Sequence, residues 1–386
     1  MLSRASRHPA YPIHDDKAVK ILLLTPSVRP LGARRSLVEL VRNLPTEHSV
    51  CVVCPAADGI AKELTDLGIS VRIVPHGAWR KLFGRLKAEF SQIPQLRRIV
   101  REFQPDVIHA NEFHAIPHAL AAARGTQIPV TGHVRLGITP RQIETYSLRK
   151  CRRVIAVSEA VKSLFAPAGM ADRVDVVYNG VGLEQFFHDG PTIPEFPRST
   201  GLTVGLFGLI SPRKNQLLAA EAVALARSKG ADLRLLLAGD AFKTTEAYGA
   251  QLRDRLAQSD LKDATMLLPF QKDVAALYRS IDINLLISSE EGFGRTIIEA
   301  AATSRPSIGA RTGGIPELIE EGRTGWLVRE GDVKELADLL VELAGDVPKV
   351  RQAGEHARTY VETRFTIEAH AQAMLTVWQN AIRRAG

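Results

Sequence analysis

The chain has 386 residues, of which 45% are apolar and 24% charged, and its 50 Lys and Arg against 42 Asp and Glu give a net charge of +8. This length suits two domains and this composition a globular protein, which excludes the collagen-like and low-complexity classes. The positive charge favours an anionic partner such as a phosphorylated molecule or a lipid surface, whereas nucleic acid is not expected, because no known nucleic-acid-binding motif appears.

Residues 1–17 are predicted to form a flexible N-terminal tail. They lack the apolar stretch of a signal peptide, and the apolar runs elsewhere are too short to span a membrane. We therefore expect a cytoplasmic location. The C-x-x-C pair, Cys51 and Cys54, lies in the apolar run SVCVVCP, which reads as a strand. Their sulfurs should then point to opposite faces, which favours packing over a redox or zinc role.

Short Val-, Ile- and Leu-rich runs alternate with helical periodicity along the whole chain, which predicts parallel sheets covered by helices on both faces. The first series occupies residues 18–183 and is predicted to be the acceptor-side domain. A polar, proline-bearing linker over 184–200 precedes a second series over 201–365, the predicted donor domain. An amphipathic helix over 366–386 is expected to pack back across the domain junction. The fold class is α/β: two doubly wound, Rossmann-like domains facing a central cleft.

The segment AWRKLFGRLKAEFSQIPQLRRIVREF in the first domain mixes Trp79, Phe83 and Leu86 with many cations. Such a segment can lie on an anionic membrane where a lipid-linked acceptor waits. An ordinary amphipathic helix with a solvated basic face is the more common arrangement for such a segment, and the residues leave both interpretations open.

In the second domain the apolar run INLLISS leads into EEGFGRTIIEA, which reads as strand, turn and helix. The glycines Gly292 and Gly294 allow a ligand close to the backbone. The amides from Phe293 to Thr296 form a helix N-terminus, which favours a phosphate. A carboxylate one turn into the helix, Glu299, is suited to a ribose diol, and Glu291 to hydroxyls beyond the phosphate. A cap and a surface acid remain the alternative.

Two further segments each follow an apolar run that is predicted to be a strand. GLISPRKNQ places Arg213 and Lys214 before a helix, where cations suit a diphosphate, although an exposed basic turn has the same appearance. ARTGGIPEL supplies a Gly-Gly turn followed by Pro316 at a helix start.

The order of GLISPRKNQ, EEGFGRTIIEA and ARTGGIPELIEEGRTGWLV resembles the retaining glycosyltransferases of family 4, which have the GT-B fold. The similarity extends from about Lys20 to the C-terminus and is most specific in the second half. The family's two glutamates separated by seven residues correspond to Glu291 and Glu299. The resemblance implies that Glu291 contacts the donor sugar, Glu299 the nucleotide ribose, and Lys214 the phosphates.

The resemblance also implies roles for neighbouring residues and for the first domain. Residues expected at the donor are Gly32, Arg213, Lys214, Glu291, Gly292, Phe293, Gly294, Thr296 and Glu299. His133, at the end of the strand PVTGHV, is expected to face the cleft and contact the donor sugar, and with Glu291 and Lys214 it completes the predicted catalytic set; a core or surface histidine is the alternative. His109 also ends a strand, and we interpret it as structural or acceptor-side.

Two positions depart from the family pattern. Leu209 follows Gly208 where the family has a phosphate-binding arginine, which Arg213 replaces from a different position. The loop after the first strand keeps one of two usual glycines, Gly32, and has Leu31 in place of the other. Both departures predict an altered diphosphate site.

The expected reaction is transfer of a hexose from a nucleotide-diphosphate donor, UDP-linked in preference, to a glycan or lipid-linked acceptor in cell-surface polysaccharide or lipopolysaccharide synthesis. No cofactor or metal is expected, because the sequence contains no Asp-x-Asp pair and helix N-termini with cations can stabilise the leaving group. Retention of configuration and front-face attack are implied. The alternatives are a noncatalytic sugar-nucleotide-binding subunit and a sugar-nucleotide epimerase of the same fold. Peripheral contact with an anionic inner membrane face is also considered.

Overall fold

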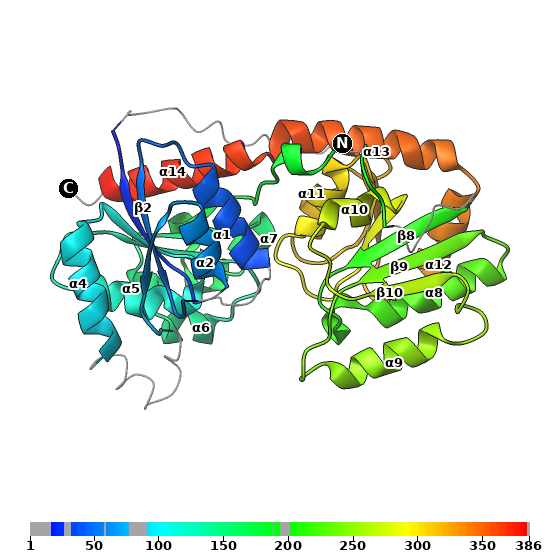
Figure 1. Ribbon diagram of the computed structural model, residues 1–386, viewed down its shortest axis with the longest axis horizontal. Coiled ribbons are helices and arrows are strands. Elements are labelled where there is room, and N and C mark those ends of the chain that lie inside the picture. The colour runs from blue at the N-terminus through cyan, green and yellow to red at the C-terminus, as the bar shows by residue number, and fades with distance from the viewer. Residues whose placement is uncertain are drawn as a thin grey trace. The chain divides into compact units, whose positions relative to one another are not determined.

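The computed structural model describes residues 17–26, 32–57, 59–76, 91–187, 189–193 and 201–383. The chain forms two compact units (Figure 1): unit 1 contains the residues up to Gly180 and those from Ile367 onward, and unit 2 runs from Val181 to Thr366. Residues 1–16 of the expected tail and 194–200 of the expected linker lie outside the described residues.

Within the described residues, unit 1 contains a seven-stranded parallel sheet in the order β3-β2-β1-β4-β5-β6-β7. Its strands are Lys20–Leu24 (β1), Ser49–Cys54 (β2), Ser70–Ile73 (β3), Val107–Ala110 (β4), Val130–Val134 (β5), Arg153–Ala156 (β6) and Val174–Val176 (β7). Its helices include Gly32–Arg42 (α1), Ile60–Asp66 (α2), Ile93–Phe103 (α4), Ile116–Ala123 (α5), Pro140–Thr145 (α6), Glu159–Ser163 (α7) and Ile367–Arg383 (α14).

The last helix, α14, belongs to unit 1, although unit 2 precedes it in the chain (Figure 1). Its apolar stripe forms because Ala371, Met374 and Trp378 recur at helical spacing, and these side chains join the core formed by β1, β2 and α1. The Trp378 side chain is fully buried. Two chain segments therefore connect the units, and they pair where Val181 N–H donates to the Phe365 carbonyl at 2.9 Å, inside unit 2.

Over residues 201–328 unit 2 contains a six-stranded parallel sheet in the order β10-β9-β8-β11-β12-β13. Its strands are Leu202–Phe207 (β8), Leu233–Ala238 (β9), Thr265–Leu268 (β10), Ile283–Leu286 (β11), Ser307–Ala310 (β12) and Gly325–Val328 (β13). Its helices include Gln216–Ser228 (α8), Glu246–Leu256 (α9), Val274–Arg279 (α10), Arg295–Ala302 (α11), Val333–Ala344 (α12) and Val347–Arg364 (α13). The predicted α/β class with two doubly wound, Rossmann-like domains is confirmed.

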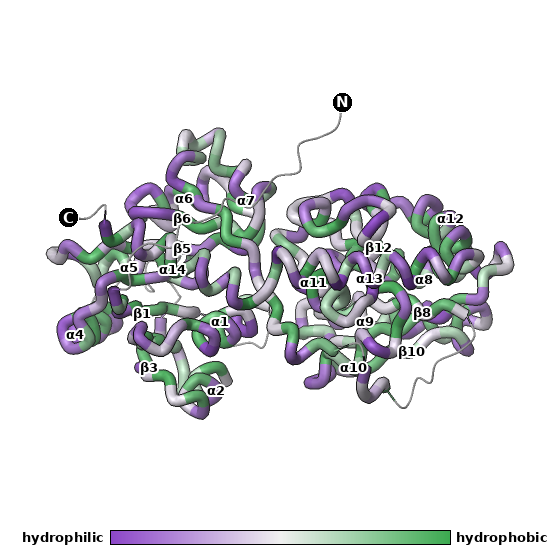
Figure 2. The backbone as a smooth tube through the Cα atoms, turned by 90° about the horizontal axis from the view of Figure 1, so that it is seen from above, coloured by the Kyte–Doolittle hydropathy of each residue, from purple (hydrophilic) through white to green (hydrophobic). Residues whose placement is uncertain are grey.

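Hydrophobic patterning explains how the helices cover the sheets. Along α12 the colour in Figure 2 changes between hydrophobic and hydrophilic within each turn, and Leu336, Leu340 and Leu343 are its fully buried leucines. The cysteines Cys51 and Cys54 are both buried and free in β2, and burial raises the pKa of the Cys54 thiol to about 12, which agrees with a packing role. Among the described residues no helix is both long and apolar enough to cross a membrane.

Candidate donor site

The turn between β11 and α11 is built around Gly294, the residue that precedes the helix. Its φ of 109° is accessible to glycine but not to other residues without strain, and a Cβ there would lie 2.8 Å from Leu286 Cδ2. α11 therefore begins at Arg295, directly after this glycine. The Thr296 hydroxyl is buried and makes no hydrogen bond within the described residues. The helix N-terminus thus presents backbone donors and one hydroxyl, a combination suited to a phosphate.

The carboxylate of Glu291, in this turn, forms an ion pair with the PRK segment that precedes α8. Lys214 Nζ lies 2.6 Å from Glu291 Oε2, and a nitrogen of Arg213 lies 3.6 Å from the same oxygen. The side chains of Lys214 and Glu291 are 12% and 14% exposed, so the pair is partly shielded but reachable from solvent. The structure therefore brings together three residues that the sequence predicted from segments 77 positions apart.

Hydrogen bonds to backbone carbonyls hold the PRK segment and the turn after β11 together. Ser289 N–H donates to the Arg213 carbonyl at 3.0 Å, and Asn215 Nδ2 donates to the Ile287 carbonyl at 2.8 Å. Arg213 also donates to the Glu290 carbonyl at 2.6 Å. The Arg213 guanidinium is thus attached to the turn itself, and its replacement of the family arginine stays a prediction; Leu209 is half-buried and accepts through its carbonyl from Gln216.

The Gly-Gly turn after β12 supports the same loop from the other side. Gly314 N–H donates to the Glu291 carbonyl at 3.0 Å, and a Cβ added to Gly313 would lie 1.9 Å from that oxygen. Gly313 has φ of 51°. The sequence predicted a Gly-Gly turn here without a role, yet the contact requires glycine at position 313 for both its backbone conformation and the space around it. A Gly-Gly pair beside two other strand-end loops was the available signal.

Glu299 lies one turn into α11, as predicted, and its side chain is 5% exposed. Tyr278 donates its hydroxyl to Glu299 Oε2 at 2.9 Å, and Arg295 donates to Oε1 at 3.1 Å and 3.3 Å. Sequence analysis missed both partners. Arg295 was detectable from its spacing of four residues on one helix, whereas Tyr278 comes from another helix and had no local signal.

Phe293 and Gly292 are both buried. The Phe293 ring packs edge-on against Phe365 with centroids 6.1 Å apart, so its side chain belongs to the core. The predicted roles of these two residues at the sugar and phosphates stay predictions.

The remaining predicted residues belong to unit 1. Gly32 is exposed and begins α1, and residues 27–31, including Leu31, lie outside the described residues. The two arginines that follow are engaged with acids: Arg34 with Glu63 at 2.8 Å and Arg35 with Glu39 at 3.1 Å. The donor role of Gly32 stays a prediction.

His133 ends a strand as expected, but its ring does not face an open edge. The side chain is fully buried, on the sheet face that α14 covers: it packs edge-on against His109, which in turn packs against Trp378. This burial agrees with the alternative of a core histidine, because Thr131 and His133 alternate onto the same sheet face as His109. Its predicted contact with the donor sugar stays a prediction.

Burial also sets the protonation of these imidazoles. Desolvation lowers the pKa of His109 to about 3, and the nearby charge of Arg135 lowers it further in the same direction. The pKa of His133 is lowered well below its usual value by the same two causes. Both rings are therefore neutral at pH 7.

Arg135, just after β5, is a polar centre that sequence analysis missed. Its guanidinium donates to Asn111 Oδ1 at 2.8 Å, to Asn179 Oδ1 at 3.0 Å and to Ser36 Oγ at 3.3 Å. These bonds join the strand ends of β4 and β5 to the first turns of α1. An arginine directly after a buried strand was the signal that pointed to it.

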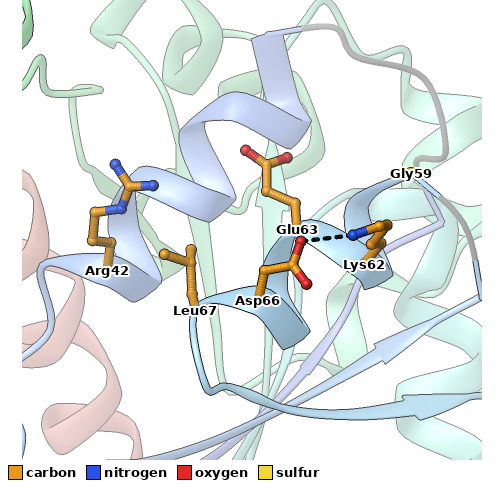
Figure 3. A pocket seen from close by; sticks show the side chains of 6 residues that line it. All are labelled: Arg42, Gly59, Lys62, Glu63, Asp66 and Leu67. Carbon is orange, nitrogen blue, oxygen red and sulfur yellow. Dashed lines mark hydrogen bonds and ion pairs between the residues drawn. The ribbon is translucent and has the colours of Figure 1, made fainter.

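A hollow of about 310 Å³ lies between α1 and α2 of unit 1 (Figure 3). Its lining residues are Arg42, Gly59, Lys62, Glu63, Asp66 and Leu67. It contains none of the predicted site residues. Three of its charges are already paired, since Lys62 Nζ lies 3.0 Å from Asp66 Oδ2 and Glu63 binds Arg34. We assign this hollow no role in ligand binding.

Two family models match the chain, one in each unit. A model described as "Glycosyltransferase Family 4" matches residues 31–185, and one described as "Glycosyl transferases group 1" matches residues 201–346. Together with the glutamate pair and the two parallel sheets, these matches define the class of protein as a GT-B glycosyltransferase. The chain belongs to glycosyltransferase family 4.

Similar proteins agree with this assignment. The N-acetyl-alpha-D-glucosaminyl L-malate synthase of Bacillus anthracis is 36% identical over 152 residues, which cover 39% of each chain, so the match spans well under half of that relative. The D-inositol 3-phosphate glycosyltransferase of Corynebacterium kroppenstedtii is 26% identical over 92% of this chain and 80% of its own. Anabaena Alr3699/HepE, solved in complex with UDP and glucose, superposes with a TM-score of 0.81 at 24% identity, covering 94% of this chain and 99% of that one, which shows the common fold.

Proposed function

We propose that the protein transfers a hexose from a UDP-sugar to a glycan or lipid-linked acceptor. The observation that carries this proposal is the Lys214–Glu291 ion pair, 2.6 Å long, at the strand end that also precedes the N-terminus of α11. A cation and a helix N-terminus suit the diphosphate of a nucleotide sugar and the charge that it carries as the leaving group. A carboxylate suits the sugar hydroxyls. The solved Anabaena neighbour contains UDP and glucose, which supports the choice of donor.

The ion pair gives Lys214 and Glu291 a partner that the donor can replace. A diphosphate offers Lys214 stronger and more numerous oxygen acceptors than Glu291 does. When Lys214 turns to the diphosphate, the carboxylate of Glu291 becomes available to hydroxyls of the sugar. Donor binding thus exchanges one internal pair for two ligand contacts, and neither charge is left alone during the exchange.

Chemistry then follows from the charges around the diphosphate. The bond between the anomeric carbon and the phosphate oxygen breaks, the acceptor oxygen bonds to the same face of that carbon, and the leaving phosphate oxygen takes the acceptor's proton. Lys214, Arg213 and the α11 amides stabilise the departing charge, so we propose metal-independent transfer with retention. NMR of the product tests this mechanism, and an inverted anomeric centre would contradict it.

The proposed acceptor is a glycan or a lipid-linked sugar. Cell-surface polysaccharide or lipopolysaccharide synthesis is our leading pathway class. The names of the Bacillus and Corynebacterium relatives contain L-malate and D-inositol 3-phosphate, so small anionic acceptors belong in the same screen. Peripheral membrane contact stays a prediction, because Trp79, Phe83 and Leu86 lie outside the described residues.

A noncatalytic sugar-nucleotide-binding subunit is the second candidate, because Leu209 replaces a phosphate-binding arginine. The epimerase alternative has no comparable supporting observation. The two candidates make different predictions for turnover: an enzyme hydrolyses bound donor slowly without acceptor, whereas a binding subunit does not.

The test is a thermal-shift screen of UDP- and GDP-linked sugars, followed by chromatographic detection of free UDP. We expect UDP-sugars to raise the unfolding temperature and slow UDP release without acceptor. The Glu291→Gln variant should retain UDP binding but lose the additional stabilisation given by the sugar. A response to GDP-sugars alone would overturn the donor choice, and tight binding without turnover across all acceptors would favour the binding subunit.

A further inference from the structure

The Glu299 carboxylate is held at both of its oxygens before any ligand is bound. Tyr278 donates to Oε2 at 2.9 Å from α10, and Arg295 donates to Oε1 at 3.1 Å from the turn of α11 directly before Glu299. The two donors come from different helices. Together they fix the rotation of the carboxylate plane, which a single donor would leave free.

Tyr278 is positioned by the core and not by the site. Its side chain is fully buried, and its ring packs edge-on against Phe207 with centroids 5.3 Å apart and lies tilted against Phe186 at 6.1 Å. Its carbonyl accepts from Arg305 Nε at 3.3 Å. The hydroxyl is therefore a donor at a fixed point, and the orientation of Glu299 depends on the packing of α10 against α11.

We propose that Tyr278 is a positioning residue for nucleotide recognition: its hydroxyl orients the Glu299 carboxylate toward the hydroxyls of a ribose diol. The inference rests on the proposed function, in which Glu299 contacts the ribose. Tyr278 donates to Oε2 and Arg295 donates twice to Oε1, so the orientation of the carboxylate is set from two helices. Loss of the Tyr278 donor removes the constraint on Oε2 alone.

The conservative variant Tyr278→Phe isolates this role, because it keeps the ring packing and removes one hydroxyl. A hydrogen bond to a charged group contributes enough that its loss should weaken ribose recognition by about tenfold. Tyr360→Phe is the matched control. Tyr360 is half-buried in unit 2, and its hydroxyl accepts a hydrogen bond from Arg364 at 2.9 Å, away from the Glu299 carboxylate.

The experiment measures the affinities of UDP and 2′,3′-dideoxy-UDP by titration calorimetry in the wild type, Tyr278→Phe, Tyr360→Phe and Glu299→Gln. We expect the wild type to prefer UDP clearly and Tyr278→Phe to lose about tenfold of that preference, with unchanged affinity for the dideoxy analogue. Glu299→Gln should remove most of the preference, and Tyr360→Phe should match the wild type. A general loss of structure would weaken both nucleotides equally.

The outcomes separate this inference from the function on which it rests. If Glu299→Gln removes the preference for UDP while Tyr278→Phe leaves the preference intact or weakens both nucleotides alike, the positioning role is wrong and the ribose contact stands. If Glu299→Gln binds both nucleotides as the wild type does, the ribose contact itself is wrong. If the wild type binds no UDP, the proposed donor fails and this inference fails with it.

Discussion

Unit 1 buries two imidazoles near its strand ends, His109 and His133, whose pKa values are lowered by desolvation, whereas unit 2 places a partly exposed ion pair at its strand ends. The rings of His109 and His133 pack against each other with centroids 5.9 Å apart, and His109 also packs against Trp378 of α14. In unit 2 Lys214 and Glu291 remain partly exposed and hold each other at 2.6 Å. A buried neutral ring contributes packing, while a partly exposed ion pair can exchange its partner for a ligand. The predictions below test this contrast.

The largest effect is expected from Lys214→Ala. In the proposed function this cation stabilises the departing phosphate, so the transfer rate should fall about 10²- to 10³-fold when it is removed. The control is Lys229→Ala, which also breaks a lysine–carboxylate pair in unit 2, with Asp338, but at an exposed position. Steady-state UDP release should be unchanged in this control, and equal losses in the two variants would contradict the assignment of Lys214.

Acid should unfold unit 1 before unit 2. Burial lowers the pKa of His109 to about 3 and that of His118 to about 4. The unfolded chain takes up these protons below about pH 6.5 and the folded chain does not, so stability falls as the pH falls. Each histidine should cost about 3 kcal/mol by pH 4.

Hydrogen exchange followed by mass spectrometry at pH 7, 5.5 and 4.5 resolves the two units. Amides of β4 and β5 should lose protection at a higher pH than those of β8 and β11. Earlier loss in unit 2 would show that its carboxylates, and not the histidines of unit 1, limit acid stability.

Gly313→Ala should displace the turn between β11 and α11, whereas its control, Gly322→Ala, should not. Both glycines have positive φ, 51° and 73°. A Cβ at Gly313 would lie 1.9 Å from the Glu291 carbonyl oxygen, whereas nothing lies within 4 Å at Gly322. Gly322→Ala therefore bears only the conformational cost of about 1 kcal/mol. Gly313→Ala should also weaken UDP-sugar binding, by about tenfold or more, which calorimetry measures; equal affinities would show that the loop does not depend on this contact.

The smallest effect is expected from Leu209→Arg, which restores the cation of the family pattern. Arg213 is already attached to the turn through the Glu290 carbonyl, so the added charge should raise UDP affinity only about two- to fivefold at low salt. Leu209→Gln controls for length without charge. If both variants behave alike, charge at this position is not what the diphosphate requires.

The sequence predicted what repeats along the chain or lies within one segment. Continuous apolar strands between helices predicted the two parallel sheets, and the local motif EEGFGRTIIEA predicted the turn and helix that carry Glu291 and Glu299. It did not predict the contacts between Tyr278 and Glu299, or the orientation of His133. Those depend on how α10 packs on α11 and which sheet face α14 covers, which are tertiary properties that no local pattern specifies.

The return of α14 to unit 1 has a consequence for the order in which the chain folds during synthesis. Unit 2 is continuous from Val181 to Thr366, so it can complete its core as soon as it emerges from the ribosome. Unit 1 begins first and finishes last, because the face of β4 and β5 that carries His109 and His133 waits for Trp378. Until that helix arrives, this face is an exposed apolar surface, and a stop codon before Ile367 should direct the protein to chaperones and proteases while leaving unit 2 folded.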